Sequence, residues 1–149
     1  MTDPTPELVH CIYTSAAVVE FRRSELDALL AGCRRNNAEL GVTGILLFQS
    51  GSFFQVLEGS RPVVEALFTK IERDPRHSKA TKLILEPIVE RSFPEWTMGF
   101  PRITTQELAT IPGLNDFFSA GSSFMTLGSG RAKVLLDGFR NGKWRASLA

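Results

Sequence analysis

The stretch Gly41-Val-Thr-Gly-Ile-Leu-Leu-Phe-Gln-Ser-Gly-Ser-Phe-Phe-Gln-Val-Leu-Glu-Gly59 holds two apolar runs on either side of a small polar turn. Two such runs predict a β-hairpin, with strands over residues 44–49 and 52–58. Side chains alternate between the two faces of a strand, so Gln55 shares a face with Phe53 and Leu57. A buried amide costs about 1–3 kcal/mol unless its carbonyl and N–H groups find partners. We therefore expect a polar group to meet Gln55 inside the protein.

Length and composition limit the class of protein. The chain has 149 residues, 43% of them hydrophobic and 22% charged, which is typical of one globular domain. A net charge of +1 argues against a general nucleic-acid binder. The apolar runs are too short to span a membrane, and the N-terminus lacks the pattern of a signal peptide. Two cysteines and two histidines provide too few ligands for a zinc site. These features predict a cytoplasmic protein with reduced cysteines and with no metal, nucleic-acid or membrane partner.

The rest of the chain alternates between strand and helix patterns. Strands are predicted over 8–15, over 81–89, where Pro87 indicates an edge or a bulge, and around Trp96, Met98 and Phe100. Ser24 and Ser60 are predicted helix caps, each followed by an apolar stripe at helical spacing. The order strand, helix, strand, strand, helix, strand, strand predicts an α+β sandwich. We expect an antiparallel-rich mixed sheet with two helices on one face.

Several polar residues fall on the apolar faces of these elements. Asn36 and Asn37 lie on the apolar stripe of the first helix, and a frayed helix end before Gly41 explains Asn36 better than Asn37. Tyr13 is either a strand aromatic with a backbone partner or a phenol beside a ligand. Amides are poor acid–base catalysts, but they can recognise a planar heterocycle with donors and acceptors. The chain contains no P-loop, GxSxG or GxGxxG motif.

The sequence resembles the BLUF domain family, which senses blue light using FAD. The resemblance covers residues 8–100, about two-thirds of the chain, and rests on motifs in the same order as in the family. These are Tyr13-Thr14-Ser15, Arg35-Asn36-Asn37, Val42-Thr43-Gly44, the run 51–59, Asp74-Pro75-Arg76-His77 and the run 91–98. It implies a ferredoxin-like βαββαββ fold with a photosensory domain over 8–100. Residues 101–149 are then expected to form a C-terminal helical extension, as in short stand-alone BLUF proteins, packed on the sheet or on a partner.

The resemblance also implies a cofactor site for non-covalent FAD. By position, Asn37 is expected to hydrogen-bond the polar edge of the flavin, and Gln55 to bridge Tyr13 and the ring. Leu29 and Ile71 are expected to sandwich the ring. Asn36 is expected near the cofactor, and the ribityl and phosphate end is assigned to Lys70, Asp74, Arg76 and His77. Tyr13 and Gln55 are the expected photoactive pair, with Trp96 or Met98 relaying the signal.

A photoreceptor of this kind is not an enzyme, so its output is expected to pass to a separate effector protein or to change a homo-oligomer, either a dimer or a larger ring. Two other classes stay open from the residues. One is a BLUF-like interaction module without photochemistry, and a colourless purified protein would favour it. The other is a small enzyme, either a flavin reductase, which would oxidise NADH steadily, or an acylphosphatase-like hydrolase. The hydrolase would need an arginine–asparagine pair in a phosphate-binding loop, which the sequence lacks.

Overall fold

The predicted hairpin forms the strands β2 (Thr43–Gln49) and β3 (Ser52–Ser60) of the computed structural model. The structure describes residues 7–17, 23–49, 52–75, 77–94, 97–98, 128, 130 and 132–136. Gln49 pairs with Ser52, which leaves a two-residue connection, as the turn signal predicted. Gly44 is required in β2, because a Cβ atom there would lie 1.8 Å from the carbonyl oxygen of Val56. The two strands therefore approach more closely at this point than a side chain allows.

Two further strands, β1 (Leu8–Ala17) and β4 (His77–Pro87), complete a four-stranded sheet in the order β2-β3-β1-β4. All the described strand pairs are antiparallel, so the parallel pairing of the expected mixed sheet is not among them. The strand predicted over 81–89 begins earlier and ends at Pro87. It lies at the edge of the described sheet, where a proline without an N–H donor is tolerated. Its pairing with β1 has register shifts between Ile12 and Tyr13 and between Thr14 and Ala16.

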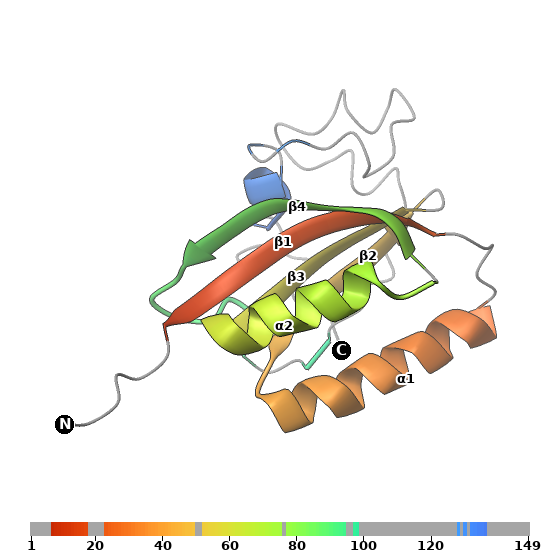
Figure 1. Ribbon diagram of the computed structural model, residues 1–149, viewed down its shortest axis with the longest axis horizontal. Coiled ribbons are helices and arrows are strands. Elements are labelled where there is room, and N and C mark those ends of the chain that lie inside the picture. Colours follow the sequence, from red (N-terminus) through yellow and green to blue (C-terminus); the bar gives the residue numbers. More distant parts are fainter. Residues whose placement is uncertain are drawn as a thin grey trace.

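The helices α1 (Arg23–Leu40) and α2 (Arg61–Glu72) both lie against the same face of the sheet (Figure 1). This arrangement confirms the predicted α+β, ferredoxin-like fold. Helix α1 begins at Arg23, so Ser24 lies inside the first turn and is not the cap that the sequence suggested. Ser60 is the N-cap of α2, with proline in the first turn, but its side chain makes no capping hydrogen bond. Packing of the apolar stripe therefore stabilises α2 more than its cap does.

One core fills the space between the helices and the sheet. It contains Val9, Cys11, Tyr13, Leu26, Leu29, Leu30, Val42, Leu46, Phe53, Leu57, Val64, Phe68 and Met98. The alternate strand positions point to the other face of the sheet, where Ile12, Phe54 and Val56 are also buried. Both faces of the sheet are therefore covered.

Residues 130 and 132–136 are helical and lie beside β4, on the face away from α1 and α2 (Figure 1). Ala132, Leu135 and Leu136 are buried, and Lys133 Nζ donates a 3.3 Å hydrogen bond to Glu86 of β4. These residues lie in the C-terminal helical extension expected over 101–149, most of which lies outside the described residues.

The predicted fifth strand is only partly described. Thr97 and Met98 lie in a bend and not in a strand, and their carbonyl groups accept hydrogen bonds from side chains of α1. The other residues assigned to that strand, Trp96 and Phe100, lie outside the described part of the chain. Within the described ranges, no helix has the length and apolar character needed to cross a membrane.

Candidate functional site

A pocket lies between α1 and α2, above the middle of the sheet. Its sheet side is formed by Tyr13, Leu46, Gln55 and Leu57, and its α1 side by Leu29, Cys33, Asn36 and Asn37. The α2 side is formed by Leu67, Lys70 and Ile71, with Asp74 just beyond the helix end. Apolar side chains dominate this lining, and a few amide, phenol and charged groups stand among them. Such a composition is typical of sites that bind small organic molecules.

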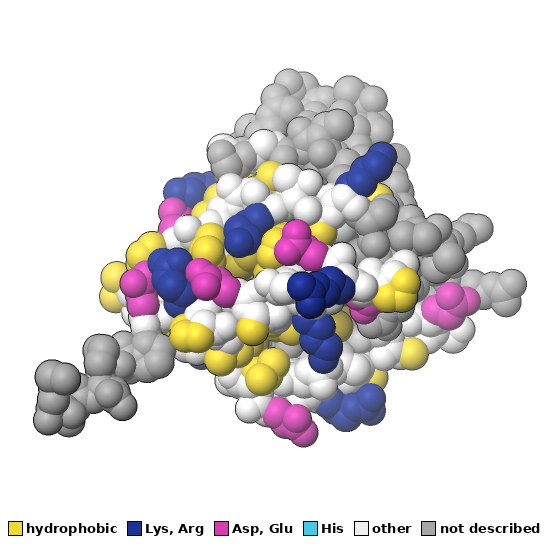
Figure 2. Space-filling view, viewed as in Figure 1, with side chains coloured by type: hydrophobic (Ala, Val, Ile, Leu, Met, Phe, Trp, Pro, Cys, Tyr) yellow, Lys and Arg dark blue, Asp and Glu magenta, His cyan; other side chains and the backbone are white. Residues whose placement is uncertain are grey.

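A second hollow continues along the same pair of helices. It shares Asn36, Leu67 and Lys70 with the first pocket and reaches Leu40 and Val63. Figure 2 shows apolar side chains gathered over these neighbouring ends of α1 and α2, with Lys and Arg side chains nearby. The groove between the helices is therefore apolar and open at the surface, and it becomes buried toward the sheet.

A chain of buried polar contacts forms part of the first pocket. Tyr13 and Gln55 are directly opposite each other on β1 and β3, and the Tyr13 hydroxyl donates to Gln55 Oε1. Gln55 Nε2 in turn donates to Met98 Sδ at 3.3 Å. The three side chains are 0%, 4% and 1% exposed, respectively. Gln55 thus has polar partners inside the core, as its position on the apolar face required.

The surroundings of Tyr13 keep its hydroxyl protonated. Burial raises the pKa of this phenol well above its usual value of 10, and the neighbouring thiols of Cys33 and Cys11 and the carboxyl of Asp74 add to the rise. The Phe68 ring packs edge-on against the Tyr13 ring, with centroids 5.2 Å apart. A neutral phenol in a fixed ring position is a suitable donor to an amide oxygen.

The two asparagines of α1 differ in burial. Asn37 is buried, and its Nδ2 donates to the Thr97 carbonyl at 2.5 Å, whereas Asn36 is exposed at the pocket edge. A frayed helix end therefore does not account for Asn37. Arg34 is exposed, but its Nε also donates to the Met98 carbonyl at 2.9 Å. Helix α1 is thus bonded to the backbone on either side of the Met98 side chain.

The other predicted site residues are only partly brought together. Leu29 and Ile71 line the pocket from facing helices, and Lys70 and Asp74 line it near the end of α2. Arg76 and Trp96 lie outside the described residues. His77 is the first residue of β4, and its side chain also lies outside the described part.

Sequence reasoning did not assign four of the residues that line the pocket: Cys33, Leu46, Leu57 and Leu67. Their spacing carried a signal, because Cys33 is four residues after Leu29 on α1 and Leu57 is two residues after Gln55 on β3. No local pattern indicated the contacts of Arg34 and Asn37, since their partners are about 60 residues away along the chain.

Comparison with known families matches this architecture to one of them. A sequence model described as "Sensors of blue-light using FAD", abbreviated BLUF, covers residues 8–99. The chain belongs to the BLUF family. This match spans β1 to β4, α1 and α2, and the Tyr13–Gln55–Met98 chain of contacts.

Relatives of known character are similar over most of the chain. Photoactivated adenylate cyclase subunit beta of Euglena longa is 39% identical over 77% of this chain, but the match spans only 13% of that protein. Among solved BLUF structures, the BlsA ground state superposes with a TM-score of 0.78 at 29% identity, covering 92% of this chain and 90% of the other. BlrB in its dark state gives a TM-score of 0.70 at 28% identity, covering 89% and 98%.

The chain therefore corresponds to a small part of the curated BLUF relatives such as the cyclase subunit. It corresponds to nearly the whole of the solved BlsA and BlrB chains. What these relatives share with it is the BLUF fold and its position in a family of blue-light sensors.

Proposed function

We propose that this chain is a blue-light photoreceptor that binds FAD non-covalently in the pocket between α1 and α2. The observation that carries the proposal is the buried Tyr13–Gln55–Met98 chain of hydrogen bonds at that pocket, in a member of the BLUF family. Residues 8–100 form the photosensory domain in this proposal, and 101–149 form an extension that packs on it or on a partner.

The lining fits a flavin ring on chemical grounds. Leu29 and Ile71 provide apolar surfaces from facing helices, which suits a planar aromatic system. Asn37 and Gln55 provide amides for the donor and acceptor groups of the ring edge. Because Asn37 Nδ2 is bonded to Thr97, its oxygen is the atom that we assign to a ring N–H.

The charged end of the cofactor requires a polar exit from the pocket. Lys70 and Asp74 line the pocket at the end of α2, and we assign Arg76 and His77, which follow directly, to the same end. Asn36 is assigned to the rim. The choice of FAD over FMN rests on the family description alone, because a basic exit suits the phosphate of either cofactor.

A bound flavin supplies blue-light absorption and a ring that accepts one electron when excited. In the proposed cycle Tyr13 would give an electron and then its hydroxyl proton to the flavin, and both would later return to Tyr13, so that no net reaction occurs. While the proton is away, Tyr13 cannot donate to Gln55 Oε1. The Gln55 amide then rearranges, by rotation or by a change of tautomer.

Gln55 suits a two-state element because its two ends differ in hydrogen-bonding role. In the structure its oxygen accepts from Tyr13 and its nitrogen donates to Met98. Rotation exchanges the two ends, so that the sulfur of Met98 loses its donor. Two arrangements that differ by a few kcal/mol can be interchanged by such a local change. We assign the relay to Met98, together with Trp96.

The output of this proposed sensor is a separate effector protein in the cytoplasm or a change in a homo-oligomer. The cyclase relative supports signalling to an effector, because its name describes a light-activated enzyme and the matched segment is only 13% of its length.

The test is the absorption spectrum of the purified, FAD-reconstituted protein, in the dark and under blue light. We expect a flavin spectrum that shifts slightly to the red and relaxes in the dark. Tyr13→Phe and Gln55→Leu should retain flavin and lose this shift, and Thr69→Val, at an exposed position of α2, should keep it. Failure to bind flavin, a normal photocycle in either pocket variant, or steady NADH oxidation would contradict the proposal.

A further inference from the structure

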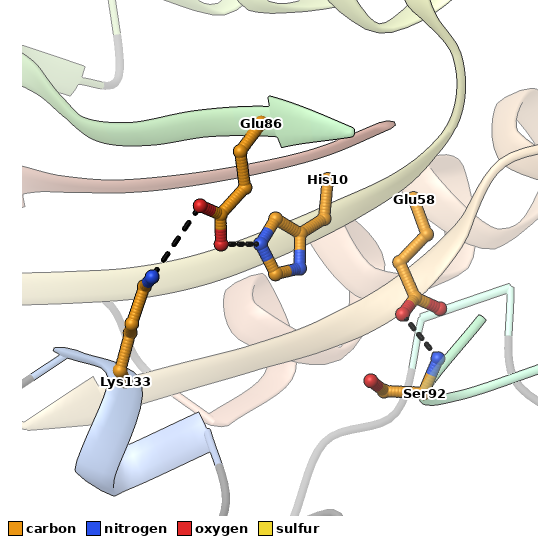
Figure 3. A network of polar contacts seen from close by, with 5 residues as sticks. All are labelled: His10, Glu58, Glu86, Ser92 and Lys133. Carbon is orange, nitrogen blue, oxygen red and sulfur yellow. Dashed lines mark hydrogen bonds and ion pairs between the residues drawn. The ribbon is translucent and has the colours of Figure 1, made fainter. Parts of the chain in front are cut away.

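Glu58 of β3 is a completely buried carboxylate on the sheet face away from the pocket, three residues after Gln55. A buried carboxylate needs donors to replace water. Its Oε2 accepts from the Ser92 amide at 2.6 Å, and its Oε1 accepts from the Phe93 amide at 3.0 Å. Figure 3 shows the contact with Ser92. The Thr43 hydroxyl of β2 donates to Oε1 as well, at 2.9 Å.

Arg91 strengthens the same attachment, because its guanidinium group donates hydrogen bonds to β2, to β3 and to the residue that follows α1. One of its nitrogens, Nη1, donates to the Thr43 hydroxyl at 2.8 Å and to the Glu58 carbonyl at 2.9 Å. The other, Nη2, donates to the Gly41 carbonyl at 2.7 Å. Residues 91–93 are therefore bonded to β3 and to the start of β2, and the buried Phe93 side chain adds packing.

Phe93 is five residues before Met98, the residue that meets Gln55. Five residues extend at most about 18 Å, so an attachment at Phe93 limits where Met98 can lie. At the other end, Met98 Sδ accepts from Gln55, and the Met98 carbonyl accepts from Arg34. Glu58 and Gln55 thus hold the two ends of one short segment, although they point to opposite faces of β3.

We propose that Glu58 is a positioning residue, whose carboxylate holds the segment 91–98 so that Met98 Sδ meets the Gln55 amide. The effect of this placement on the photocycle rests on the proposed function. The placement of Met98 by Glu58 does not depend on that function. Loss of one acceptor from Glu58 frees the Ser92 or Phe93 amide and loosens Met98, which lies on the other side of the sheet.

A second network on the same sheet face provides a matched control. His10 of β1 is paired with Glu58 in register, but its Nε2 donates to Glu86 of β4 at 2.9 Å, and Lys133 donates to the same carboxylate. Figure 3 shows this network beside Glu58. It joins β1, β4 and the C-terminal helical residues, and its hydrogen bonds run among His10, Glu86 and Lys133, not to the described part of the segment 91–98. Glu86→Gln therefore perturbs the same face without releasing Met98.

The first test is NMR of the protein in the dark, labelled at its methionine methyl groups. The chain has three methionines, so Met98→Leu identifies the Met98 signal. We expect Glu58→Gln to shift or broaden that signal and Glu86→Gln to leave it in place. If Glu58→Gln does not fold, Thr43→Val, which removes one donor to Glu58, should perturb the Met98 signal and Thr43→Ser should restore it. An unchanged Met98 signal in the folded Glu58→Gln or Thr43→Val variant would overturn the proposal.

The second test measures dark recovery of the FAD-loaded protein. We expect Glu58→Gln to change the recovery rate by about threefold or more in the Met98 protein, which corresponds to a barrier change of about 0.65 kcal/mol. In the Met98→Leu background, the same substitution should change the rate by less than about 1.5-fold. Equal changes in both backgrounds would mean that Glu58 affects recovery independently of Met98, and a lower melting temperature with an unaltered rate would mean that it acts on stability alone; either result would overturn the proposal. If the unmodified protein shows no light-induced shift, the proposed function fails, and the Met98 signal still decides the placement.

Discussion

Replacement of Tyr13 by phenylalanine removes one buried hydroxyl and leaves the ring in place. The hydroxyl donates to Gln55 Oε1, and both side chains are almost fully buried. Without its donor, the amide oxygen stays unpaired in apolar surroundings, which costs about 1–3 kcal/mol of unfolding free energy. For a chain of 149 residues, each kcal/mol lowers the melting temperature by about 2–4 °C.

Gln55→Leu should cost a similar amount, because it leaves the phenol without an acceptor and Met98 Sδ without a donor. The double variant removes both polar partners at once, and replacing both by apolar groups is nearly neutral relative to an unpaired group. We therefore expect the two losses to be non-additive. The double variant should be more stable than the sum of the single losses predicts, by about 1 kcal/mol or more.

The assay is urea unfolding of the flavin-free protein, so that ligand binding adds nothing to the measured stability. As a control, Val89→Ala at a fully exposed position should combine additively with Tyr13→Phe, within about 0.3–0.5 kcal/mol. Additive losses for Tyr13→Phe and Gln55→Leu would refute the reasoning, because they would mean that the two groups do not interact in the folded protein.

Three further outcomes are expected. Gly44→Ala should lower the free energy of unfolding by about 1–3 kcal/mol, since its Cβ would clash with a backbone carbonyl of β3. Gly32→Ala, in α1 with open space around the new methyl group, should raise it by about 0.5–1 kcal/mol; a reversed order in urea unfolding would contradict both. Hydrogen bonds from the histidine of β1 and from the lysine of the C-terminal helix lower the pKa of Glu86 below its usual 4.5. Its contribution to stability should be complete above pH 4.5 and lost as pH falls through the lowered pKa, and Glu86→Gln should flatten that part of the stability profile. Bound FAD should slow alkylation of Cys33, which lines the pocket, whereas Cys11 should not react in the folded protein because burial raises its pKa to about 12; equal labelling of Cys33 with and without FAD, measured by mass spectrometry, would argue against the cofactor site.

Local patterns predicted most of the secondary structure correctly. The hairpin, both helices and the edge position of the strand that ends at Pro87 all depend on residues close together in sequence. Predictions at the ends of elements were less accurate. Ser24 is the second residue of α1, and helix ends are generally uncertain by one or two residues when they are inferred from local signals.

The site could be predicted in part for the same reason. Strand alternation placed Gln55 on the core face, and helical spacing placed Asn37 on the stripe of α1. The bend at Met98 could not be predicted, because its carbonyl and sulfur are held by Arg34 and Gln55 from two different elements. Nor did any pattern indicate that Glu58 accepts from Ser92 and Phe93 across 34 or 35 residues.

The sequence by itself determined which residues are apolar, which polar residues interrupt the apolar faces, and therefore where a polar pocket had to form. Only the tertiary structure decided which partners those polar residues meet. Periodicity describes one element at a time, whereas the contacts of Tyr13, Gln55 and Met98 join β1, β3 and a bend more than 40 residues further along the chain. Those partners are settled by strand register and by the need to pair every buried donor and acceptor, and both depend on the folded chain as a whole.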